Sequence, residues 1–192
     1  PYNTAVSKLK RITLLRYMVA SRWVLHALLL VLGLIQKAIG VAEFDNKVFG
    51  LIAVTYTYNL IFYLYLRRNP RGISERGLRF VSIIQVLLDQ VVYTVVLYAS
   101  GGVESLSFLF YFITIFMAII LLNELEIIGL MFFTVSLYVS VLALEYTDVI
   151  EHHARYHFDP GFVGNIGVTV NNGATVVLIL VFTSFFAAFI NN

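Results

Sequence analysis

The sequence contains no cysteine and has little charge. The absence of cysteine excludes disulfide bonds, thiolate chemistry and cysteine-ligated metal sites. Only 12% of the 192 residues are charged, 60% are hydrophobic, and the mean hydropathy is +0.87. Soluble domains are about 25% charged, and a net charge of +2 offers no strong field to an anionic partner. The composition argues against a soluble monomer, a disordered chain and a nucleic-acid binder, and it favours an integral membrane protein.

Six apolar runs are each long enough to cross a bilayer as a helix of about 17–20 residues. They lie near residues 17–35, 48–66, 80–99, 105–122, 127–144 and 173–190. Because alternating strand patterns are missing, we expect an all-α membrane protein with six transmembrane helices in one compact bundle over residues 1–192. The chain begins at a proline and ends just past the sixth run, so we expect it to be a fragment of a longer protein.

The placement of lysine and arginine predicts the orientation of the spans. Nine of the 13 basic residues fall in the N-terminal segment and the second loop, which lie on one side if the spans alternate. We therefore expect both termini in the cytoplasm. The longest loop, from about Glu145 to Asn172, then faces outward and is acidic. Within that loop His153 and His157 have the i, i+4 spacing that can share a metal on a helix, although a solvated or membrane-surface helix explains the same pattern.

Polar residues inside the expected spans share helix faces, and an ionisable residue in hydrocarbon usually has a partner or a cavity. These residues are Arg22 and His26 in the first span, Asn59 in the second, and Gln85, Asp89 and Tyr93 in the third. At a rise of about 1.5 Å per residue, His26, Asn59 and Asp89 reach similar depths. This predicts an intramembrane cluster of these three side chains with Arg22 and Gln85 beneath it. The alternative is that these groups only join helices by hydrogen bonds and that Arg22 extends to the interface.

The stretch after the third span is the most specific feature of the sequence. Gly101 and Gly102 are expected to end the third helix in a tight turn, and Ser105 is expected to cap the fourth helix. We also list Tyr111, at the start of that helix, as a candidate signal-binding residue.

This stretch resembles the six-helix membrane input domain of bacterial sensor histidine kinases, such as the type IV pilus and redox-responsive sensors. In that family the third helix carries an aspartate and ends in Gly-Gly. Two variable residues follow, then Asn or Ser, Pro, Phe, two more variable residues, Leu and Tyr. The matching positions are Asp89, Gly101, Gly102, Ser105 and Tyr111. Phe110 replaces the leucine, Leu106 the proline and Ser107 the phenylalanine.

The resemblance implies a multi-pass sensor of the bacterial inner membrane that passes a membrane or envelope signal through its sixth helix to a cytoplasmic kinase domain. It further implies a homodimer, a downstream response regulator and, from the redox sensors, a quinone as a possible ligand. Because small residues favour helix contacts in lipid, Ala187 and Ala188 are candidates for the dimer face. We expect no catalysis by this chain itself, since kinase domains are absent from it.

Two other functions remain open from the residues. Asp89 with His26 is also the kind of pair that relays protons or cations in a small transporter or channel. Alternatively, the chain is a non-sensing module that anchors or assembles a complex.

Overall fold

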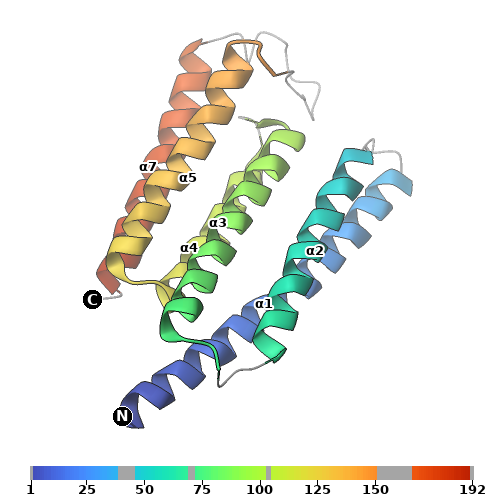
Figure 1. The fold of residues 1–192 in the computed structure, drawn as a ribbon. Coiled ribbons are helices and arrows are strands. Elements are labelled where there is room, and N and C mark those ends of the chain that lie inside the picture. Colours follow the sequence, from blue (N-terminus) through green and yellow to red (C-terminus); the bar gives the residue numbers. More distant parts are fainter. Residues whose placement is uncertain (1, 39–45, 69–71, 103–104, 151–165, 191–192) are drawn as a thin grey trace. The chain divides into compact units, whose positions relative to one another are not determined.

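The computed structural model describes residues 2–38, 46–68, 72–102, 105–150 and 166–190. Within these ranges the chain is helical apart from turns, and it contains no strand. The helices are α1 (Tyr2–Ala38), α2 (Asn46–Arg68), α3 (Glu75–Ala99), the 3-10 helix η2 (Leu106–Leu109), α4 (Phe110–Leu121), α5 (Glu124–Tyr146) and α7 (Ile166–Ile190) (Figure 1). The predicted all-α class is confirmed. His153 and His157 lie outside the described residues.

Three helices of the described chain are long and apolar enough to cross a membrane. They are α3, α5 and the Thr169–Ile190 part of α7, while Leu106–Leu121 forms a shorter apolar stretch. Membrane character is therefore supported for these helices. The six-span bundle and the cytoplasmic termini stay predictions.

The chain divides into two compact units, residues 1–82 and 83–192, and each is described by itself. In the first unit α1 and α2 pack against each other. Arg16 Nη2 donates to the carbonyl oxygen of Leu66 at 2.9 Å, and Asn59 Nδ2 donates to that of Val19 at 3.0 Å. Because early residues of α1 meet late residues of α2, the two helices are antiparallel.

In the second unit α7 packs against both α5 and α4. A Cβ atom added at Gly173 would lie 2.7 Å from Leu142 Cδ1, so the absence of a side chain there permits the close approach of α5 and α7. Ala187 and Ala188 are only 1% and 4% exposed within the single chain. Their expected place on a dimer face is therefore wrong, since small residues here serve packing inside the chain.

Helix α5 begins with a capping box. Asn123 Oδ1 accepts from the Glu126 amide at 2.9 Å, and Glu126 Oε2 accepts from the Asn123 amide at 2.9 Å. This explains the acidic residues at the start of α5, because carboxylates there satisfy and offset the exposed amides of the first turn.

The flanking helices extend into the segment from Glu145 to Asn172 that was expected to be a loop. Helix α5 continues to Tyr146 and α7 begins at Ile166. Polar residues such as Asn171 and Asn172 interrupt the apolar run, so the sequence did not predict the first turns of α7. At the other end, Glu145 lies on the buried face of α5 and is 3% exposed.

Candidate functional site

The candidate residues inside the expected spans are all buried, but they belong to two units. Arg22, His26 and Asn59 lie in the first unit, and their exposed fractions are 5% or less. Gln85 and Asp89 lie in the second unit and are 0% and 4% exposed. A cluster that joins His26 and Asn59 to Asp89 would cross between the units, so it stays a prediction.

In the first unit the polar residues contribute to the packing of α1 against α2. The Asn59 side chain donates to the backbone of Val19, as described above, while its Oδ1 atom has no hydrogen-bond partner in the structure. The Tyr56 ring lies 4.9 Å from the Trp23 ring and 6.0 Å from the His26 ring, between centroids. The hydrogen bond of Asn59 fits the helix-joining interpretation, and its second polar atom is left available for another donor.

In the second unit, hydrogen bonds between side chains join α3 to α4. Thr94 Oγ1 donates to the Gln90 carbonyl at 2.7 Å and lies 2.7 Å from the Tyr111 hydroxyl. Because the single hydroxyl proton of Thr94 is committed to Gln90, Tyr111 is the donor to Thr94. We call Gln90, Thr94, Tyr111 and Thr114 the α3–α4 clasp.

The other half of the clasp mirrors the first. Gln90 Nε2 donates to Thr114 Oγ1, which in turn donates to the Tyr111 carbonyl at 2.8 Å. Each helix thus contributes one long side chain and one threonine, and all four residues are 8% exposed or less. Gln90 Oε1 is buried and has no hydrogen-bond partner in the structure. An acceptor without a donor in this setting raises the free energy of the packed state, so the clasp has one unfilled hydrogen-bonding position.

The Gly101–Gly102 turn follows α3 as the sequence predicts. Gly101 and Gly102 have φ angles of 113° and 52°, in the left-handed region that favours glycine. Ser105 caps η2, which leads into α4, by accepting from the Ser107 amide at 3.0 Å. The Ser100 hydroxyl contacts the hydroxyls of both Ser105 and Ser107. The turn is therefore closed by its own hydroxyl groups, and the predicted end of α3 is confirmed. The predicted cap is corrected, because Ser105 caps η2, whereas Leu109, the N-cap of α4, makes no side-chain cap hydrogen bond.

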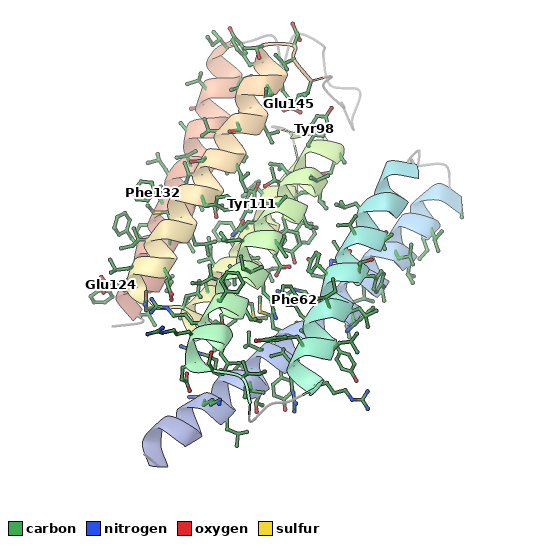
Figure 2. All side chains as sticks on the ribbon, in the orientation of Figure 1. Phe62, Tyr98, Tyr111, Glu124, Phe132 and Glu145 are labelled. Carbon is green, nitrogen blue, oxygen red and sulfur yellow. The ribbon has the colours of Figure 1, made fainter. Side chains whose placement is uncertain are left out.

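The carboxylate of Glu145 occupies the space beside Gly102. A Cβ atom at Gly102 would clash with Oε1, Oε2 and Cδ of Glu145. Glu145 and Tyr98, in the last turn of α3, lie at the same end of the second unit (Figure 2). The last turn of α5 thus contacts the turn between α3 and α4.

Tyr138 lies on the same buried face of α5 as Glu145 and is 1% exposed. Buried polar side chains are thus present on α3, α4 and α5 of the second unit. Tyr93, another predicted candidate, stacks on Phe110 of α4 with 5.3 Å between ring centroids and extends the α3–α4 contact.

Sequence reasoning missed Gln90, Thr94, Thr114, Tyr138 and Glu145. A signal for Glu145 was present, because residues 127, 130, 131, 134, 138, 141 and 145 follow the three- and four-residue spacing of one helix face, and all are buried. For Gln90 and Thr94 the spacing of four marked one face of α3, yet it did not identify the partner helix.

A quinone at this turn stays a prediction. The Tyr111 hydroxyl donates to Thr94, and the Glu145 carboxylate only accepts hydrogen bonds, so neither group offers a donor to a quinone carbonyl.

The described residues contain no cluster of three or more histidines, aspartates or glutamates arranged to hold a metal ion. Comparison with protein-family models, with curated proteins and with solved structures found no match to this chain.

Proposed function

We propose that this chain is the membrane-embedded signal-input domain of a bacterial sensor histidine kinase. It perceives a membrane or envelope signal and transmits the change through α7 to a cytoplasmic kinase domain. The proposal takes its family from the Asp89, Gly-Gly and Ser105–Tyr111 pattern of the sequence.

One structural observation carries the proposal. Helices α4 and α5, which hold Tyr111 and Tyr138, both pack against α7. A change in the buried polar groups therefore has a short mechanical route to the helix that would leave the domain. A packed helix bundle transmits such a change when a ligand binds one of two arrangements more tightly than the other.

The most direct test reads the gene beyond Asn192. We expect a phosphoacceptor histidine on a helix, followed by an ATP-binding domain. A gene that ends at this point, together with no kinase copurifying with the protein, would contradict the proposal.

The second test measures autophosphorylation of the full-length protein in liposomes. Thr94→Val and Asp89→Asn are expected to change the basal rate several-fold in either direction, because each alters the interior that sets the helix packing. Phe132→Leu is the matched control, since Phe132 is 64% exposed on α5. If the variants and the control have equal rates, the chain is an anchor and senses nothing.

Ion or proton transport is the second candidate, favoured by two buried carboxylates, Asp89 and Glu145, in the second unit. Flux measurements in liposomes separate it from sensing. Proton or cation flux that Asp89→Asn abolishes would assign transport, whereas the sensor shows no flux above that of empty liposomes.

A further inference from the structure

Basic residues are concentrated in the first unit to an unusual degree. Residues 1–82 contain 12 lysines and arginines against three acids, whereas residues 83–192 contain one against eight. Five basic side chains that are exposed in the structure lie on three helices of the first unit. They are Lys10, Arg16, Arg67, Arg76 and Arg79, which we call the basic cluster.

If α1 and α2 cross the membrane as the sequence predicts, the helix connections put the basic cluster at one membrane interface. Helix α3 is long and apolar enough to span, and Arg76 and Arg79 lie in its first turns. Because only a short connection separates α2 from α3, the end of α2 at Arg67 lies at that same interface. Arg16 of α1 is joined to this end through its hydrogen bond to the Leu66 carbonyl.

In the predicted topology, in which α1 crosses the membrane, the length of α1 puts its first turns outside the hydrocarbon. Its 37 residues extend over about 56 Å at 1.5 Å per residue, against a hydrocarbon core of about 30 Å. Lys10 precedes Arg16 by six positions on this helix, and in that topology it lies on the headgroup side of the interface.

Two members of the cluster are held in place by the protein. Arg16 Nη2 bonds the Leu66 carbonyl, while Arg67 Nη1 donates to the Tyr63 hydroxyl at 3.2 Å and its guanidinium lies 5.8 Å from the Tyr63 ring centroid. A guanidinium has five N–H donors, so neither side chain is used up by one such bond. Holding them in advance lowers the entropic cost of binding a ligand.

We propose that the basic cluster is a binding surface for the headgroups of anionic phospholipids. The positive charge of the cluster complements an anionic headgroup, and in the predicted topology the cluster lies at the depth of the headgroups. The five exposed cations lie on α1, at the end of α2 and at the start of α3, where the first turn contains one acid, Glu75. Clusters of this size beside a membrane helix attract anionic lipid. The proposal is independent of the kinase assignment, since it concerns how the first unit sits in lipid.

The test titrates the full chain, in nonionic detergent, with phosphatidylglycerol or with phosphatidylcholine. Bound lipid is counted by native mass spectrometry and the change in Tm is recorded, because a ligand that binds the folded state raises Tm. We expect phosphatidylglycerol to bind and to raise Tm, and phosphatidylcholine to do neither. High salt should weaken the binding, because exposed charges are screened.

Variants locate the surface. Lys10→Gln with Arg76→Gln removes two cluster charges that make none of the side-chain hydrogen bonds described above, and it should weaken phosphatidylglycerol binding roughly 25-fold, at about fivefold per basic residue. Lys37→Gln with Lys47→Gln is the matched control, since it removes two charges at the opposite end of the α1–α2 pair. The Tm of each variant in phosphatidylcholine shows that it is folded.

Three results would overturn the proposal. The first is equal phosphatidylglycerol binding by the wild type and the cluster variant. The second is an equal loss in the control variant, which would indicate attraction by net charge alone. The third is binding of inorganic phosphate as tight as that of phosphatidylglycerol, which would make the surface a phosphate site without lipid specificity.

Discussion

The Glu145 carboxylate lies directly against Gly102, in the space that any larger residue would need for its Cβ atom. The contact joins the last turn of α5 to the turn between α3 and α4, and Glu145 is 3% exposed there. Gly102 also has a φ of +52°, which L residues rarely adopt. Glycine is therefore required at this position for two independent reasons.

Gly102→Ala should lower the free energy of unfolding by about 2–3 kcal/mol, because it combines an unfavourable backbone conformation with a clash against the carboxyl group. Thermal unfolding in detergent measures the change. Gly129→Ala is the control: Gly129 lies in α5 and a Cβ atom there meets nothing within 4 Å, so that variant should be slightly stabilised by the better helix propensity of alanine. Equal Tm values for the two variants would contradict both the backbone cost at Gly102 and the contact with Glu145.

A double variant separates the two causes. In Gly102→Ala with Glu145→Ala the clash is removed and only the backbone cost of about 1–2 kcal/mol remains. The alanine at residue 102 should thus cost less in the Glu145→Ala background than in the wild type. Equal costs in both backgrounds would assign the whole effect to the φ angle.

This turn also shows which features of the structure the sequence could predict and which it could not. Gly101, Gly102 and Ser105 act locally, through residues close in the chain, so the end of α3 and a capping role for Ser105 were predictable, although Ser105 caps η2 and not α4. The carboxylate beside Gly102 comes from a residue 43 positions later in the chain. Its apolar neighbours end at Leu144 and Glu145 is charged, so a loop was expected where the helix continues to Tyr146.

The sequence did not predict the α3–α4 clasp, for a different reason. Periodicity places Gln90 and Thr94 on one face of α3, but the rotation of α4 about its axis decides whether Tyr111 and Thr114 meet them. That rotation is set by packing of the whole second unit. The predicted cluster of His26, Asn59 and Asp89 depends in addition on how one unit is placed against the other. Equal depth in a membrane does not determine that placement.

The clasp predicts unequal costs for its two single variants. Thr94→Val leaves the buried Tyr111 hydroxyl without its acceptor and should cost about 1–3 kcal/mol, whereas Tyr111→Phe leaves Thr94 still bonded to the Gln90 carbonyl and should cost about 0.5–1.5 kcal/mol. Adding Tyr111→Phe to Thr94→Val should recover part of the loss, because it removes the unsatisfied hydroxyl. Tm values of the four proteins measure the coupling, which in membrane helices averages about 0.6 kcal/mol.

Tyr17→Phe serves as the control for loss of a tyrosine hydroxyl, since Tyr17 is 70% exposed. It should leave Tm unchanged. Strict additivity of Thr94→Val and Tyr111→Phe would mean that the two hydroxyls do not bond, and only the Gln90–Thr114 bond would then join α3 to α4 within the clasp.

Close packing of α5 on α7 makes Gly173 sensitive to the size of its substituent. Its Cβ would meet only Leu142 Cδ1, the end of a flexible side chain, so Gly173→Ala should be nearly neutral. Gly173→Val adds two more carbons and should force the helices apart at a cost of about 1–3 kcal/mol. Gly129→Val is the control for a branched residue in a helix, because it has open space around it.

Shortening the opposing side chain tests whether the contact itself is responsible. Leu142→Ala makes room for the valine, so the Gly173→Val and Leu142→Ala double variant should unfold at a higher temperature than the sum of the single losses predicts. If Leu142→Ala gives no such rescue, the cost of the valine comes from elsewhere along α7. A rescue that restores Tm and also restores the autophosphorylation rate of the full-length protein would connect this α5–α7 contact with signal transmission, because both quantities would then depend on the same pair of side chains.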